Sequence, residues 1–102
     1  MKEIKSVKEF EEAKGKKSVM MFTAGWCPDC VAVKPVLPDI VSNFPDYEFY
    51  SVNRDEFIDL CQDLNIFGIP SFVAYENNLE LGRLVNKDRK TQEEIETFIK
   101  GL

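Results

Sequence analysis

The hydrophobic and polar positions of this chain switch repeatedly between helical and strand-like spacing. A capping box followed by apolar residues three apart predicts a first helix over about residues 6–15. The apolar run 18–23 predicts a buried strand, and apolar positions three or four apart predict a long helix over about 27–43. Because Pro35 and Pro38 each remove a backbone hydrogen bond, a kink or break is expected within that helix.

The second half of the chain alternates in the same way and then closes with a hairpin. Residues 47–53 alternate like a strand, and an apolar stripe over 57–64 predicts a short helix. The segments 71–76 and 79–85 predict the two strands of a hairpin. Two asparagines at 77–78 are expected to form its turn, because asparagine tolerates a positive φ.

A second capping box, Thr91 with Glu94, opens a last helix that extends to the end of the chain. With a weakly marked strand at the N-terminus, helices and strands alternate until the closing hairpin and last helix. This order predicts an α/β fold, in which helices flank both faces of a central mixed sheet of four to five strands. At 102 residues the chain is expected to form a single domain over 1–102.

The charge balance and the absence of long apolar runs limit the partners and the compartment that we expect. Thirteen basic and 18 acidic side chains give a formal net charge of −5, which disfavours nucleic acid and anionic membranes as partners. We see no apolar signal-peptide core and no run long enough to span a membrane. We therefore expect a cytoplasmic protein, and lasting structural disulfides are rare in that compartment.

Two cysteines carry the chemistry. Cys27 and Cys30 lie in the run Gly-Trp-Cys-Pro-Asp-Cys, between the predicted strand and the long predicted helix. A helix N-terminus favours the thiolate of the first cysteine, and Pro28 suits the first helical position. Cys30 lies one turn further along the same side, within reach of the first sulfur. We expect a dithiol–disulfide redox pair with Cys27 exposed at the helix tip and Cys30 shielded behind it.

A metal site is the other interpretation of a C-x-x-C motif. Zinc takes about four ligands, but this chain has no histidine and one further cysteine, Cys61. Cys61 lies on an apolar helical stripe, which favours core packing over a regulatory thiol. No metal is therefore expected, and no bound cofactor, since the chain has no G-x-G-x-x-G motif.

Together these features resemble the thioredoxin family over essentially the whole chain. Trp-Cys-x-x-Cys follows a buried strand, and Pro35 falls five residues after Cys30, where that family has the proline that kinks its active-site helix. Phe-Gly-Ile-Pro-Ser at 67–71 matches the family's Gly-Ile-Pro-Thr element, so the Ile69–Pro70 bond is expected to be cis. The variant Trp-Cys-Pro-Asp-Cys resembles the eukaryotic cytosolic thioredoxin-related proteins.

The resemblance implies a thioredoxin fold and thiol–disulfide oxidoreductase activity. Cys27 would attack a disulfide in a protein or small molecule, and Cys30 would then attack Cys27 to release the reduced substrate. The implied substrate-binding rim comprises Trp26, Pro28, Ile69 and Pro70. Electrons would come from an NADPH-dependent, flavin-containing thioredoxin reductase, and the protein would act as a monomer.

Some positions depart from the family pattern. Met21 replaces a buried aspartate, and Ser51 replaces the lysine that accompanies it. Asn86 lies near the place of a groove glycine, and Pro28-Asp29 replaces the usual Gly-Pro. Since the family's aspartate is thought to take up the proton of the second cysteine, that proton must go elsewhere here. Water, the departing substrate thiolate and Asp29 are the three candidate acceptors.

Several alternatives stay open at the level of sequence. The chain could be a binding or adaptor module with residual redox activity, or a glutaredoxin-like reductase. Asp29 is either a favourable charge at a helix N-terminus or a group that modulates the ionisation of the two sulfurs. We expect Trp26 to be exposed beside the active site, and the basic segment 87–90 to be a solvated loop.

Overall fold

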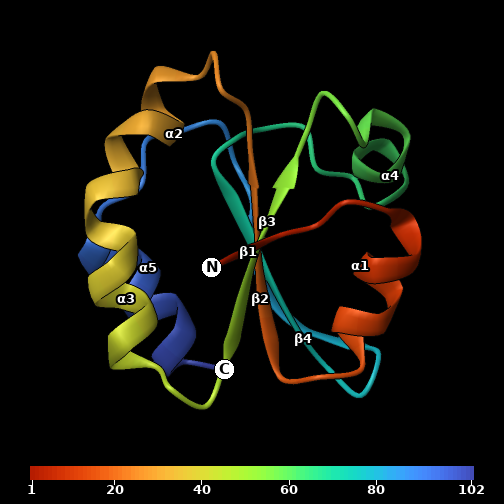
Figure 1. Cartoon of the computed structure of the whole chain (residues 1–102). Helices are drawn as coiled ribbons and strands as arrows, with labels where there is room; N and C mark the ends of the chain where they lie inside the picture. The colour runs from red at the N-terminus through yellow and green to blue at the C-terminus, as the bar shows by residue number, and fades with distance from the viewer.

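A computed structural model describes residues 1–102, which form a five-stranded mixed sheet in the order β1-β3-β2-β4-β5 (Figure 1). The strands are β1 (Lys2–Glu3), β2 (Ser18–Thr23), β3 (Glu48–Asn53), β4 (Ser71–Glu76) and β5 (Leu79–Leu84). The β1–β3 and β2–β3 pairs are parallel, whereas β2–β4 and β4–β5 are antiparallel. The expected mixed sheet is thus confirmed.

Helices cover both faces of this sheet, as predicted. They are α1 (Val7–Lys14), α2 (Pro28–Val33), a 3₁₀ turn (Lys34–Val36), α3 (Leu37–Asn43), α4 (Ile58–Asp63) and α5 (Gln92–Lys100). Figure 1 shows α2, α3 and α5 on one face and α1 and α4 on the other. No helix has the length and apolar character that crossing a membrane would require.

The prolines divide the long predicted helix as expected. Pro35 lies in the 3₁₀ turn, and Pro38 lies in the first turn of α3. Both prolines lie at the start of their helical segment, where the backbone N–H has no partner within the helix, so its loss is tolerated. The bend leaves α2 as a short six-residue helix whose N-terminus points to one end of the sheet.

The capping predictions also fit, with one difference. Thr91 and Glu94 form a complete capping box at α5. At α1, Ser6 accepts the N–H of Glu9, but the Glu9 carboxylate accepts the N–H of Lys5 instead of that of Ser6. The hairpin turn is as predicted, with positive φ at both asparagines between β4 and β5.

Strand β2 is buried on both sides and separates two apolar cores. Met20 and Phe22 pack with residues of α1 and α4. Val19 and Met21 pack with residues of α2, α3 and α5. A central strand covered on both faces needs apolar side chains at consecutive positions, which explains the unbroken run in the sequence.

The antiparallel pairing of β2 and β4 positions the redox motif. Phe22, near the end of β2, pairs with Ser71, the first residue of β4. The loop that leaves β2 and the loop that enters β4 therefore meet at the same end of the sheet. This pairing brings the 24–30 and 66–70 segments together, although they are about 40 residues apart in the sequence.

Candidate functional site

Cys27 is the N-cap residue of α2. Its backbone is extended, with φ −86° and ψ 113°, and its sulfur accepts the N–H of Cys30 at 3.2 Å. Pro28 follows at the first helical position, as predicted. The sulfur thus occupies the place where a helix start stabilises negative charge through its free N–H groups and its dipole.

Both cysteines of the motif are buried, as was expected for Cys30 but not for Cys27. Cys27 is only 5% exposed and Cys30 is completely buried, so the prediction of an exposed first cysteine was wrong in degree. Ala24 packs against the pair, and Ile69 contacts it from the neighbouring loop. The Cys27 thiol lies 3.9 Å from the Ile69 carbonyl oxygen, to which it donates. The two loops together leave only an edge of Cys27 open.

Burial has an electrostatic consequence for Cys30. The pKa of its thiol is raised, first by burial and then by its hydrogen bond with Cys27. Hydrogen bonds with the Thr23 side chain and the Ala24 backbone oppose this rise. All three cysteines are free thiols here. Cys30 therefore holds its proton in the dithiol state and must lose it before it can attack.

The loop before β4 packs closely on the backbone of Asn86. The Ile69–Pro70 peptide bond is cis, as expected. The Ser71 hydroxyl donates to the Gly68 carbonyl at 2.5 Å and contacts the Asn86 carbonyl at 3.3 Å. A Cβ on Gly68 would lie 2.4 Å from the Asn86 carbonyl carbon, so only glycine fits there. The 66–70 loop thus lies directly on the backbone of Asn86.

Trp26 is exposed beside the motif, as predicted. Its side chain is 62% exposed, and its indole N–H donates to the Asp55 carboxylate at 2.7 Å. The Arg54 guanidinium lies 6.0 Å from the ring centroid. Sequence reasoning missed both partners, because they come from the loop after β3 and no local pattern links them to the motif.

Asp29 also has a partner that the sequence did not indicate. Its carboxylate accepts the Arg89 guanidinium at 2.9 Å across 60 positions of sequence. This pair fixes the loop before α5 to the first turn of α2. Arg89 belongs to the basic segment 87–90, which was expected to be a purely solvated loop.

The last residue of that segment contradicts the expectation. Lys90 is only 4% exposed, and its ammonium donates to the backbone carbonyls of Asn86 at 3.3 Å and Asp88 at 2.5 Å. A buried lysine just before a capping box has no signature in sequence periodicity. Its burial is decided by where the loop packs.

Met21 and Ser51 are neighbours across the sheet. They pair directly between β2 and β3. They are also the two positions where the resemblance expects an aspartate and its lysine, so the two charges are absent together. A hollow between the strands β1 and β3 and the start of α3 is lined by both residues and also by Thr23 and Ala24.

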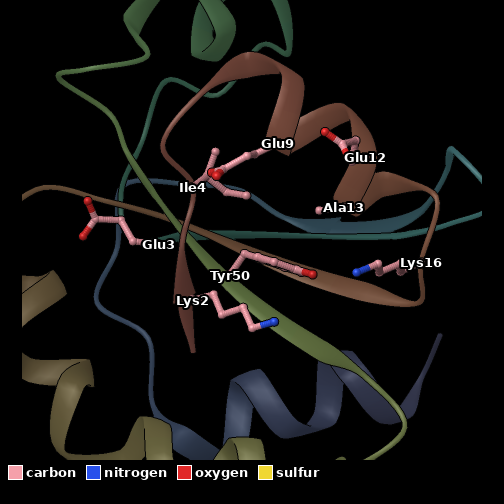
Figure 2. A pocket seen from close by; sticks show the side chains of 8 residues that line it. All are labelled: Lys2, Glu3, Ile4, Glu9, Glu12, Ala13, Lys16 and Tyr50. Atoms are coloured by element: carbon pink, nitrogen blue, oxygen red, sulfur yellow. The ribbon is translucent and has the colours of Figure 1, made fainter.

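Neither the hollow beside α1 nor the third cysteine, Cys61, forms a second redox site. Figure 2 shows a hollow between β1 and α1 whose lining is mostly charged and contains no sulfur. No group of three or more histidine, cysteine or acidic side chains is placed to hold a metal ion. Cys61 lies on the buried side of α4 and packs in the core that this helix shares with α1, which confirms core packing for this residue.

Comparison with known proteins gives the same family. The thioredoxin family model matches residues 2–101. A thioredoxin of Mycoplasma genitalium is 35% identical over 92 residues, which cover 88% of this chain and 90% of the relative.

The fold agrees as well. Oxidised thioredoxin O1 of Arabidopsis thaliana has a TM-score of 0.82 at 26% identity, covering 99% of this chain and 96% of that one. A chain from a study of thiol resolution in a yeast mitochondrial 1-Cys peroxiredoxin via glutathione/thioredoxin systems has a TM-score of 0.86 at 23% identity. It covers 100% of this chain and 95% of that chain. With its paired Cys27 and Cys30 at a helix start, this chain is a thiol–disulfide oxidoreductase of the thioredoxin type and belongs to the thioredoxin family.

Proposed function

We propose that Cys27 is the attacking sulfur and Cys30 the resolving sulfur of a disulfide-reducing cycle. The observation that carries this assignment is the asymmetry of the pair. Cys27 caps α2 and is 5% exposed, whereas Cys30 is completely buried behind it. A bulky target disulfide can meet the first sulfur but not the second.

The cycle has two exchange steps. The Cys27 thiolate attacks a target disulfide, and a mixed disulfide forms while one target sulfur leaves as a thiolate. Cys30 then attacks the Cys27 sulfur, so that the intramolecular disulfide forms and the second target sulfur is released. The target gains two electrons and the Cys27–Cys30 pair is oxidised.

The rim of the site fits an extended peptide. The exposed side chains are those of Trp26 and Pro28, Ile69 is half-buried, and Pro70 is buried beneath them. Because Pro70 offers little side-chain surface, its contribution is to hold the backbone beside Ile69 open for pairing with a target strand. Trp26 would cover the other side of the target sulfur, held by Asp55.

Disulfide-containing proteins are the target class that the family implies. One chain of similar fold comes from a study of thiol resolution in a yeast mitochondrial 1-Cys peroxiredoxin via glutathione/thioredoxin systems, which is chemistry of this kind. We further propose that this chain acts as a single monomeric domain in a reducing compartment such as the cytoplasm. An NADPH-dependent flavin thioredoxin reductase would return its electrons.

A trapping experiment tests the roles of the two cysteines. Cys30→Ser should accumulate mixed disulfides on Cys27, because attack still occurs and resolution does not. Cys27→Ser should trap nothing, because an unassisted hydroxyl is a poor nucleophile. Non-reducing gels after mixing with a disulfide-bonded protein separate the outcomes. Trapping by the Cys27 variant alone would reverse the assignment.

A further inference from the structure

Phe67 is an aromatic side chain that lies in solvent close to the redox pair. It is 75% exposed, more than any other large apolar side chain of the protein. Single exposed apolar residues are common, so the place of Phe67 in the fold decides its meaning. It lies two residues before Ile69, whose carbonyl oxygen is 3.9 Å from the Cys27 sulfur. Because consecutive Cα atoms are about 3.8 Å apart, the Cα atoms of Phe67 and Ile69 lie within about 7.6 Å of each other.

The Phe67 ring lines a hollow formed where two loops meet. The lining comes from the loop before β4 and from the loop after β5, and consists of Asn65, Phe67, Gly68, Val85, Asn86 and Lys87. A Cβ on Gly68 would lie 2.5 Å from the backbone nitrogen of Lys87, so the two loops are in direct contact there. This contact places the Lys87 backbone against the residue that links Phe67 to Ile69.

Lys87 is the one charged group in this lining, and it has no partner. Its side chain is exposed and takes part in none of the ion pairs of the protein. No acidic side chain lines the hollow. The neighbouring cations are engaged, since Arg89 binds the Asp29 carboxylate and Lys90 binds backbone carbonyls. A phenyl ring and a free ammonium are therefore the two groups that the hollow offers to an incoming chain.

Trp26 and Phe67 belong to different sides of the central strand. The indole N–H of Trp26 donates to Asp55, which follows β3, whereas Phe67 precedes β4. In the sheet, β3 and β4 lie on opposite sides of β2, the strand that leads to Cys27. An extended target segment that crosses Cys27 from the Trp26 side therefore leads toward Phe67 and Lys87.

We propose that Phe67 and Lys87 form a recognition subsite beside Cys27 for a segment of the target protein. The segment is extended and carries an apolar side chain that covers the Phe67 ring and an acidic side chain that pairs with Lys87. Covering the ring removes apolar surface from water, and no carboxylate of the lining competes for the ammonium. The proposal rests on the proposed role of Cys27 as the attacking sulfur, and adds to it a preference among disulfide-containing proteins.

Synthetic peptides whose single cysteine carries a chromogenic aromatic thiol through a disulfide test this subsite. The Cys27 thiolate attacks the peptide sulfur and bonds to it, and the aromatic thiolate leaves with the bonding electron pair because it is the more acidic thiol. One peptide has a leucine and a glutamate on both sides of its cysteine, so that either chain direction presents them. A second peptide has serine in place of leucine, and a third has lysine in place of glutamate.

The same aromatic thiol on 2-mercaptoethanol is the reference disulfide, because it presents no neighbouring side chains, and every peptide rate is divided by the rate of this reference. Wild type should favour the leucine–glutamate peptide about tenfold over the serine peptide and about threefold over the lysine peptide. Phe67→Ala should remove the first preference, and Lys87→Glu should reverse the second. High salt should weaken only the preference for glutamate over lysine, because it screens exposed charges.

Two control variants change matched side chains at the other end of the sheet. Leu79→Ala removes another exposed apolar side chain, at the start of β5, where Leu79 pairs with the last residue of β4. Lys100→Glu makes the same charge change as Lys87→Glu at the end of α5, and Figure 1 shows the C-terminus far from the start of α2. Both controls should keep the wild-type preferences. Phe67 and Lys87 are themselves exposed, so their variants should fold as wild type does.

The outcomes separate the subsite from the proposed cycle. The absence of either preference in wild type, or an equal loss of preference in Phe67→Ala and Leu79→Ala, would contradict the subsite and leave the role of Cys27 intact. The same holds if Lys87→Glu changes the rates of the glutamate and lysine peptides by one common factor. If wild type releases aromatic thiol from neither the peptides nor the reference, the role of Cys27 fails and the subsite with it. A leucine preference lost only in Phe67→Ala, with a charge preference reversed only in Lys87→Glu, supports the proposal.

Discussion

Helices α2 and α4 invite comparison because they are built alike yet differ in chemistry. Each has six residues, each follows a strand of the sheet, and each carries a buried cysteine, Cys30 or Cys61, whose pKa is raised by burial. The difference lies at their N-termini. The sulfur of Cys27 caps α2, whereas α4 starts at Phe57 without a side-chain cap. Cys61 is buried and has no second sulfur nearby, so it is an inert thiol. Cys30 is equally buried, but the sulfur of Cys27 at the start of α2 makes the two a redox pair.

The largest expected effect separates the two helices by activity. Cys27→Ser should reduce the catalysed reduction of insulin disulfides by dithiothreitol to the uncatalysed rate, because the attacking thiolate is gone. Cys61→Ser should keep the wild-type rate, because Cys61 is only 2% exposed and lies in the core between α4 and α1. A loss of activity in the Cys61 variant, once its folding is verified, would show that α4 takes part in the chemistry.

The two variants should rank in the opposite order for stability, with Cys61→Ser losing more than Cys27→Ser. Cys61→Ser places a hydroxyl among apolar neighbours and should cost about 1–3 kcal/mol. That cost lowers Tm by about 4–8 °C per kcal/mol in a domain of this size. Cys27→Ser should have little effect on the reduced protein, since serine is a good N-cap. Thermal unfolding in the presence of a reductant measures both, and equal shifts would contradict the comparison.

The pH dependence of stability should sharpen the comparison. Folding raises the pKa of Cys30 and of Cys61, so the unfolded chain releases these protons at lower pH than the folded one. Their contribution is therefore complete below the ordinary thiol pKa and is lost as pH rises above it. Denaturant unfolding between about pH 8 and 9 should show this loss. Tyr50 and Tyr75 add a loss of their own only at higher pH, because an unfolded tyrosine ionises near pH 10 and burial raises the folded pKa of each to about 12.

Oxidising the protein separates the contributions of Cys30 and Cys61 to this loss of stability with rising pH. In the oxidised protein Cys30 no longer titrates, so the decline with pH should be smaller and should come from Cys61. In oxidised Cys61→Ala it should vanish over the same range. A decline that is identical in the oxidised and reduced proteins would mean that Cys30 contributes nothing to it.

The smallest expected effect concerns the acidic residue in the first turn of each helix. Asp29→Asn should make the protein more oxidising, because a negative charge beside the thiolates is removed and the reduced form gains stability. The shift should not exceed about 20 mV, since an exposed charge pair is worth only about 0.2–1 kcal/mol.

Two variants control this measurement, which uses equilibration with glutathione. Asp59→Asn removes the corresponding acidic residue of α4 and should leave the potential unchanged. Arg89→Met removes the partner of Asp29 and should shift the potential in the opposite direction. If Asp29→Asn matches Asp59→Asn, the carboxylate acts only as a favourable charge at the helix start.

Much of the fold follows from local signals. The run 18–23, the paired asparagines and the second capping box each indicate their elements because the stabilising interactions lie within a few residues. The break at Pro35 and Pro38 is of the same kind, since each proline acts on its own helical turn. The pair of Cys27 and Cys30 is also local, which is why the motif could be found before the fold.

The contacts that tune the site were not predictable in this way. Asp55 holds Trp26, and Arg89 holds Asp29, across 29 and 60 positions of sequence. Such pairs depend on which loops meet at one end of the sheet, and charged side chains in a loop carry no periodic signal. The same reason explains why Lys90 was expected in solvent.

The sequence by itself determined the order of elements, the redox pair and the first helical position of Pro28, because these depend on spacing along one segment. Tertiary structure alone decided how deeply Cys27 is buried and which charged partners Trp26 and Asp29 have. The antiparallel pairing of β2 with β4 brings Ile69 onto the sulfurs. The packing of the last loop at that end of the sheet buries the Lys90 side chain, whose ammonium binds the carbonyls of Asn86 and Asp88.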